Sequence, residues 1–265
     1  MSKTIREYSY VFDQPVRYKE LFIYPIKIKD YYEFSFYAQS LMLEKNSIKD
    51  PQLAIKAISM SYLEYLLQYP EKIKVGNLEY DFYQLFDGLI RLSLNIRESE
   101  EKIKYGLIPH PFFEINGIKY GSDDFDEIRS IIAEQNMLDL PDERIQKNVR
   151  DSLEEAKRFK QKLNNNKVAS FEEQIMALAT YTGWELEYIY EVTYRKFILA
   201  IRRANQNIMP NIYLTASLSG FVSFKDKSIL KSWLADIEIE DKYEDVKMSP
   251  EQLQSKANFD EARKK

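Results

Sequence analysis

Apolar residues recur at helical spacing along most of the chain. They recur every three or four positions from Asp30, which stands where an N-cap is expected, so a helix is predicted from Asp30 through Met42. Asp50-Pro51 predicts the start of a second helix, and Pro70 predicts its end. The same spacing predicts further helices over residues 81–96, 125–136, 141–163, 175–181, 185–207 and 225–236.

Short segments of β-branched and aromatic residues lie between these helices and predict strands. Residues 8–28 are of this kind and are interrupted by prolines, so a small sheet of short strands is expected there. Gly76-Asn77 predicts the tight turn of one hairpin, and Asn116-Gly117 predicts a type I′ turn within a second hairpin over residues 112–120. The expected fold class is α+β, predominantly α-helical with short antiparallel β-hairpins.

The chain is expected to divide at residues 164–166, three asparagines with the composition of a linker. Residues 1–163 are predicted to form an N-terminal α+β region with hairpins that ends in a long polar helix. The apolar stripe of this helix is narrow, which is typical of a helix that crosses between subdomains or packs against a partner. Residues 164–240 are predicted to form a helical region, with an irregular apolar segment over residues 210–224. Residues 241–265 are rich in charge and predict a mobile tail.

Composition and charge narrow the function classes. The chain has 265 residues, with 38 Lys and Arg against 42 Asp and Glu, a formal net charge of −4 and a sequence pI of about 5.4. A chain with this acidic balance is not expected to bind nucleic acid. The lack of cysteine excludes a disulfide framework, a thiolate zinc site, an iron–sulfur cluster and a cysteine nucleophile. The only histidine is His110, between two prolines, and the pattern favours an ordinary loop residue over a metal ligand.

Motifs for nucleotide binding, zinc peptidases and serine hydrolases do not occur, so no cofactor and no catalytic residue is predicted. Residues 122–127 concentrate acids, which could bind a divalent cation, but capping of the helix that follows explains them without a metal. No apolar run approaches the roughly 18 residues of a membrane span, and the first residues have no hydrophobic leader. The protein is therefore expected in a cytosol, without membrane contact.

A helix–turn–helix outline lies in the C-terminal half of the chain. Residues 170–173 form a capping box, Thr182-Gly183-Trp184 breaks the first helix, and the second begins at Glu185. In a DNA-binding protein, the start of this second helix would face phosphates, and Glu185 and Glu187 would repel them. The charge of these helices therefore argues against a DNA-binding role.

Two segments resemble parts of known phage proteins. They are LFIYPIKIKDYYEF at residues 21–34 and IMALATYTGWELE at residues 175–187. The first is similar to a short strand followed by Tyr-Pro-Val-Lys-x-x-Asp-Tyr, which opens proteins encoded in the tail-morphogenesis region of phages and prophages of Gram-positive hosts. The second resembles the helix–Thr-Gly-Trp–helix element of small phage tail assembly chaperones.

The resemblance implies a non-enzymatic role in tail morphogenesis in the cytoplasm of a bacterial host, as a tail assembly chaperone that binds the tape measure protein. A structural tail-tip or baseplate subunit of the virion is one alternative, and a metal-assisted enzyme that uses the acids of residues 122–127 is another. Formation of a homo-oligomer is left open. A chaperone would offer an apolar groove to a helical client. The expected partner-binding residues are Trp184, Tyr188, Tyr194, Phe197 and Ile201.

Overall fold

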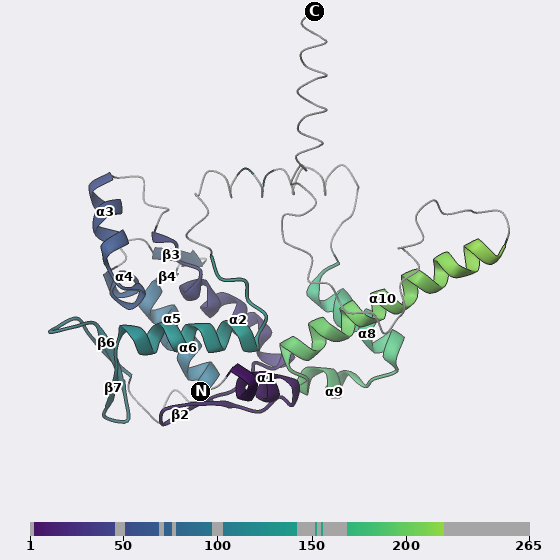
Figure 1. Ribbon diagram of the computed structural model, residues 1–265, viewed down its shortest axis with the longest axis horizontal. Helices are drawn as coiled ribbons and strands as arrows, with labels where there is room; N and C mark the ends of the chain where they lie inside the picture. Colours follow the sequence, from purple (N-terminus) through teal and green to yellow (C-terminus); the bar gives the residue numbers. More distant parts are fainter. Residues whose placement is uncertain are drawn as a thin grey trace, which may run out of the picture.

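The computed structural model describes residues 3–45, 51–68, 72–75, 78–96, 103–141, 152, 155 and 169–219. The helices are α1 Lys3–Val11, η1 Ile28–Asp30, α2 Tyr31–Tyr37, η2 Ala38–Leu41, α3 Pro51–Ser59, α4 Tyr62–Gln68, α5 Phe82–Leu94, α6 Ser122–Gln135, α8 Phe171–Thr182, α9 Leu186–Glu191 and α10 Tyr194–Leu218. The strands are β1 Val16–Tyr18, β2 Leu21–Ile23, β3 Lys72–Val75, β4 Leu78–Asp81, β5 Lys104–Gly106, β6 Phe112–Ile115 and β7 Ile118–Tyr120. Helices dominate, which confirms the predicted α+β fold class (Figure 1).

The strands of the described residues form three small antiparallel sheets, β1-β2, β3-β4 and β5-β6-β7. Asn116 and Gly117, between β6 and β7, have φ angles of 53° and 76°, which are the positive values that the predicted type I′ turn requires. The hairpin expected around Gly76-Asn77 is present as β3 and β4, while its turn lies outside the described residues. β5 adds a third strand that the sequence pattern does not predict.

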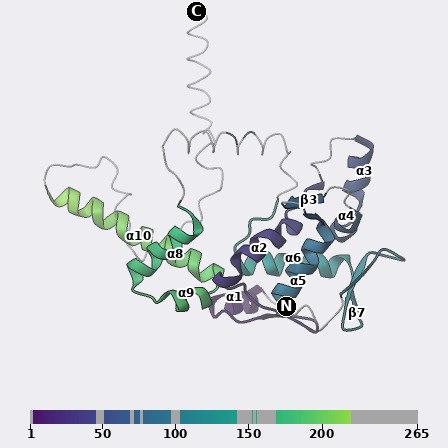
Figure 2. The ribbon, with the colours of Figure 1, turned by 180° about the vertical axis from the view of Figure 1, so that it is seen from behind.

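The main core lies between α2, α4, α5 and α6 and the β6-β7 hairpin, with α5 packed on α2 and α6 packed on α4 (Figures 1 and 2). Phe86 of α5 is fully buried at its centre, with ring centroids 5.6 Å from Phe113 and 4.9 Å from Phe125. Phe113 in turn stacks on Tyr120 at 5.3 Å. The alternating positions of β6 and the helical stripes of α5 and α6 therefore converge on one aromatic cluster.

Two predicted elements in this part of the chain are wrong. The sheet expected over residues 8–28 is reduced to the β1-β2 hairpin, because residues up to Val11 form α1, where Tyr10 is buried and donates a hydrogen bond to Glu134 at 2.8 Å. The single helix expected after Pro51 is instead α3 and α4. Ser61 separates them by capping α4, with its hydroxyl accepting a hydrogen bond from the Glu64 amide at 3.1 Å.

The start of α8 and its end are both formed by the residues that the sequence indicates. The Ser170 hydroxyl accepts from the Glu173 amide at 3.2 Å, and the Glu173 carboxylate accepts from the Ser170 amide at 2.6 Å, which is the predicted capping box. Gly183 ends the helix with a φ of 74°, a left-handed conformation that glycine adopts without a steric penalty.

The helix predicted over residues 185–207 is interrupted and extends further than expected. It is interrupted at Val192, because the backbone there pairs with an earlier segment: the Ile28 amide donates to the Val192 carbonyl at 3.0 Å, and the Tyr194 amide donates to the Ile26 carbonyl at 2.8 Å. α10 then runs through Pro210 to Leu218, so the irregular segment expected over residues 210–224 is wrong as far as residue 218. Proline deprives the helix of one amide donor there, and the helix continues around it.

α8, α9 and α10 enclose a second apolar cluster that also includes Ile28. Around the backbone pairing, Asp13 accepts a hydrogen bond from Thr193 at 2.9 Å and forms an ion pair with Lys196. The Nζ atoms of Lys27 and Lys29 each lie 2.6 Å from a carboxylate oxygen of Glu191. Their hydrogen bonds lower the pKa of Glu191 to about 2. These contacts dock the C-terminal helices against the N-terminal part of the chain.

Several predicted features lie outside the described residues. They are the polar helix over residues 141–163, of which only 141, 152 and 155 are described, the linker at 164–166, the helix over 225–236 and the tail from 241. Within the described part of the chain, none of the helices has the length and apolar character needed to cross a bilayer.

Candidate functional site

α8 runs alongside only the first half of α10. Near the start of both helices, the Phe171 and Phe197 rings lie 5.5 Å apart, edge to face. Ten residues further along each helix, the Asn207 amide donates a hydrogen bond to the Tyr181 hydroxyl at 2.6 Å. The two helices therefore run in the same general direction, but α8 crosses α10 at an angle, and α10 continues past the end of α8, as Figures 1 and 2 show.

Three of the five residues predicted to bind a partner pack inward along this shared stretch. Phe197 is fully buried, and Ile201 is partly buried against the same cluster. Tyr194 packs there too, and its ring stacks on Tyr31 at 5.0 Å. Burial raises the pKa of Tyr194 to about 12, and the Tyr31 hydroxyl reinforces the shift. Phe197 thus belongs to the core of the C-terminal helices and is not part of an exposed surface.

Trp184 and Tyr188 are the two predicted residues that lie at the surface. Their side chains are 37% and 55% exposed, and the rings pack edge to face with centroids 5.1 Å apart. Gly183 positions Trp184, because its left-handed backbone reverses the chain between α8 and α9. We call this pair the aromatic turn.

The apolar stripe of α10 that faces the core near Phe197 continues beyond Asn207 as an exposed surface. Ile201, Ile208 and Ile212 follow at spacings of seven and four residues, so they lie on one side of the helix. Ile208 is 38% exposed and Ile212 is 54% exposed. We call these two residues the exposed α10 face.

Sequence reasoning missed the exposed α10 face because Pro210 was expected to end the helix. The signal that identifies it is the apolar spacing, which continues unchanged from Ile201 to Ile212 across the proline. From Ile208 to Leu218, at about 1.5 Å per residue, α10 offers about 16 Å of helix beyond α8. No residue from Ala204 to Ser219 carries a charge.

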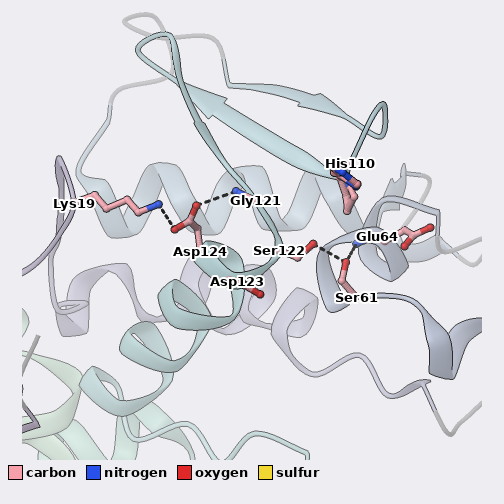
Figure 3. A pocket seen from close by; sticks show the side chains of 9 residues that line it. Lys19, Ser61, Glu64, His110, Gly121, Ser122, Asp123 and Asp124 are labelled. Atoms are coloured by element: carbon pink, nitrogen blue, oxygen red, sulfur yellow. Dashed lines mark hydrogen bonds and ion pairs between the residues drawn. The ribbon is translucent and has the colours of Figure 1, made fainter.

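A second candidate site is the hollow beside the start of α6, which contains the acids weighed as metal ligands. It has a volume of about 460 Å³ and is lined by Lys19, Ser61, Glu64, His110, Pro111, Gly121, Ser122, Asp123 and Asp124 (Figure 3). The Ser122 hydroxyl donates to the Ser61 hydroxyl at 2.8 Å, and His110 lies on the opposite side. The acids stand in the first turn of α6, where they stabilise the positive end of the helix.

The Asp124 carboxylate is already occupied by protein donors. It accepts from the Tyr18 hydroxyl at 2.6 Å and from the Gly121 amide at 3.0 Å, and it forms an ion pair with Lys19. Burial raises the pKa of Asp124, but these donors outweigh burial and hold that pKa below its usual value. In the part of the chain that the structure describes, no group of three or more Asp, Glu, His or Cys side chains could hold a metal ion.

We expect Mg²⁺, Mn²⁺ or Ca²⁺ to leave the melting temperature unchanged, because a cation would have to displace Lys19 from Asp124. A site of micromolar Kd would add roughly 2.7 kcal/mol of stability at about 100 times its Kd. Thermal melting with each cation measures the effect. A rise in Tm that disappears in an Asp124→Asn variant would restore the metal-assisted alternative.

Comparisons of the chain with protein families, with curated proteins and with solved structures find no match. The candidate sites are the aromatic turn, the exposed α10 face and the hollow beside α6.

Proposed function

We propose that the protein is a non-enzymatic binding protein of phage tail morphogenesis, a tail assembly chaperone that holds a helical segment of the tape measure protein. The observation that supports this most strongly is the exposed α10 face. Its apolar stripe is the same one that packs into the core beside α8, and α10 presents it without a charged residue. A stripe of this kind suits an amphipathic helix that packs by its own apolar positions.

In this proposal, the client helix lies on α10 beyond the end of α8. α8 packs along α10 as far as Asn207, and the client lies on Ile208 and Ile212 just beyond. Complete burial of one isoleucine side chain is worth about 1.5–3 kcal/mol. Ile208 and Ile212 are 38% and 54% exposed, so together they contribute roughly what one buried isoleucine does, and further contacts of the client supply the rest of the affinity.

The resemblance of residues 21–34 and 175–187 to tail-morphogenesis proteins also supports the proposal. The second of these segments contains Trp184 of the aromatic turn and ends within α9. The alternative of a structural tail-tip or baseplate subunit uses the same surfaces and differs in where the protein ends up. Mass spectrometry of purified particles separates the two, because a chaperone is absent from the mature virion and a subunit is retained in it.

Co-expression with the tape measure protein tests the proposal. Wild-type protein is expected to keep the tape measure protein soluble and to co-purify with it. An Ile208→Ser/Ile212→Ser variant is expected to weaken the complex by about tenfold or more, because the surface that the two isoleucines still expose amounts to about one buried side chain. The matched control is Leu214→Ser, which removes an exposed leucine from the opposite side of the same helix. We expect this control to retain the complex.

Trp184→Ala tests the contribution of the aromatic turn in the same assay, since truncating an exposed aromatic at the edge of an interface weakens binding. Equal recovery of the tape measure protein with wild type, Ile208→Ser/Ile212→Ser and Trp184→Ala would place the binding site elsewhere. A tape measure protein that behaves identically with and without this chain would remove the chaperone proposal altogether.

A further inference from the structure

β5 is the outer strand of its sheet, and one of its two edges has no neighbour among the described strands. β6 lies on its other side, in the order β5-β6-β7. In an antiparallel pair, every second residue directs its amide and carbonyl away from the neighbouring strand. Apart from the pairing with β6, residues 103–108 form no backbone hydrogen bond to any other described residue. The open edge of β5 therefore presents backbone donors and acceptors to which a further strand can bond.

An apolar hollow of about 670 Å³ lies beside this edge. Its walls are aromatic and aliphatic side chains from the end of β5, from β6 and from the helices α4 and α5, among them Tyr105, Leu107, Ile108, Phe112, Leu67 and Tyr83. Leu107 is 40% exposed and Ile108 is 87% exposed. Two large apolar side chains thus face solvent at the place where backbone groups are also unbonded.

The hollow follows the edge of the sheet, because both faces of the sheet contribute to it. Tyr105 faces the helices, and its ring centroid lies 6.0 Å from that of Tyr83 and 6.5 Å from that of Phe86. Gly106 faces the other side, where it pairs with Phe112. A Cβ atom at Gly106 would collide with the Phe112 ring, so the glycine allows this ring to extend over β5. A strand added beside β5 would therefore direct alternate side chains into the hollow.

We propose that this edge and its hollow, which we call the β5 groove, bind an extended segment of a partner protein. The segment adds a strand to the sheet and places a large apolar side chain in the hollow. The unbonded backbone groups require a polypeptide, and the lining selects the apolar side chain. β6 and β7 lie at the opposite end of the described molecule from α10 (Figure 1), so the inference is independent of the proposed function.

Charge indicates a further property of the bound segment. Lys104 lies on the face of β5 opposite to Tyr105, and its side chain is 70% exposed while it forms an ion pair with Glu114 at 3.1 Å. An acid on the added strand, opposite Lys104, would extend this pairing by one strand. Residues 103–108 contain no acid, and a second copy of β5 would bring another Lys104 to the same face. The charge pattern therefore favours a segment of a different protein over a second copy.

A capped eight-residue peptide that alternates apolar and polar residues tests the inference. Phenylalanine and valines form one face, and glutamates and threonines form the other. Fluorescence anisotropy of the labelled peptide measures its binding to the full-length chain. We expect binding, and we expect the bound peptide to slow hydrogen exchange of residues 103–108, since the added strand protects their amides.

Two N-methylated versions of the peptide show whether a ladder forms. Each carries methyl groups on alternate backbone nitrogens, so each blocks one edge of the peptide and leaves the other intact. One version is expected to bind about tenfold more weakly or worse, and the other within about twofold of the parent peptide, because only one edge bonds β5.

Leu107→Asp places a charge in the wall of the hollow and is expected to weaken binding of the parent peptide by about tenfold or more. The matched control is Ile118→Asp. Ile118 is also 40% exposed, but it belongs to β7, at the opposite edge of the same sheet. We expect the control to bind the peptide like wild type. Thermal melting of both variants checks that each is folded.

No binding of the parent peptide overturns the inference, and so does an equal effect of the two methylated versions, because the hollow would then accept an apolar group without a ladder. Equal weakening by Leu107→Asp and Ile118→Asp would place the peptide outside the β5 groove. A dimer of the chain in sedimentation that Leu107→Asp dissociates would assign the groove to a second copy. None of these outcomes affects the tape measure assay, which depends on Ile208 and Ile212.

Discussion

Phe197→Ala is expected to lower the free energy of unfolding by about 3–5 kcal/mol, because it removes a buried ring from a small core. Phe197 is fully buried, lies 5.5 Å from the Phe171 ring and is the largest fully buried side chain of the cluster between α8, α9 and α10. The few neighbouring side chains cannot fill the space, so α8 is expected to lose its packing on α10. Urea unfolding followed by Trp184 fluorescence measures the change in a Trp233→Phe background, where Trp184 is the only tryptophan.

Tyr188→Ala is the control for this prediction. Tyr188 is also an aromatic residue of the predicted partner-binding set, but it is 55% exposed, so we expect a change in unfolding free energy within about 0.5 kcal/mol. A Phe197→Ala protein that unfolds like wild type but no longer binds its partner would reverse the assignment of Phe197 to the core. Equal destabilisation by both substitutions would show that the aromatic turn contributes to the fold as much as the buried ring.

The elements that could be predicted from the sequence are those formed by residues close together in the chain. Asn116-Gly117 has the backbone freedom that a type I′ turn needs, and the hairpin follows from it. The capping box at Ser170 and Glu173 and the break at Gly183 are also local, and both are present. In each case, the residues that carry the signal make the interactions themselves.

The elements that could not be predicted depend on contacts between distant residues. α9 ends at Glu191 because Val192 and Tyr194 bond to the backbone of Ile26 and Ile28, which no local pattern reveals. β5 forms only because β6 lies beside it. At Pro210 the sequence predicted an irregular segment, but the structure has a helix there. The cost of one missing amide donor was smaller than the helical preference of the residues around the proline.

Only part of the candidate site could be predicted, because its exposed part depends on which residues of α10 are covered by distant segments. The spacing of Tyr194, Phe197 and Ile201 indicates an apolar helical face, but a helical pattern does not say which stretch of that face α8 covers. Ile201 still packs on the cluster between α8, α9 and α10, and the exposed stretch of this face begins with Ile208. Trp184 and Tyr188 were predicted together with this stripe, and the structure places these two at the surface, after the turn at Gly183.

The docking of α10 depends on a buried side chain at the end of α6. The Asn136 side chain is fully buried, accepts a hydrogen bond from the Ile26 amide at 3.0 Å and donates one to the Ile132 carbonyl at 2.9 Å. The carbonyl of the same Ile26 accepts the Tyr194 amide, with which α10 begins. Gln135 supports the segment from the other side by donating to the Ile23 carbonyl at 3.0 Å. Asn136 therefore fixes the backbone to which the C-terminal helices are attached.

Asn136→Ala is expected to lower the free energy of unfolding by about 2–4 kcal/mol, because two buried hydrogen bonds are lost and the Ile26 amide is left without its acceptor. Hydrogen exchange should show faster exchange of the Tyr194 amide, since the Ile26 carbonyl that it bonds is no longer held in place. Asn211→Ala is the control: its amide bonds Asn207 at the surface at 3.1 Å, so we expect a change within about 0.5 kcal/mol. Unchanged protection of Tyr194 in Asn136→Ala would mean that the other contacts of α10 with the N-terminal part, such as the Tyr31–Tyr194 stacking and the ion pair of Asp13 with Lys196, are sufficient to hold it.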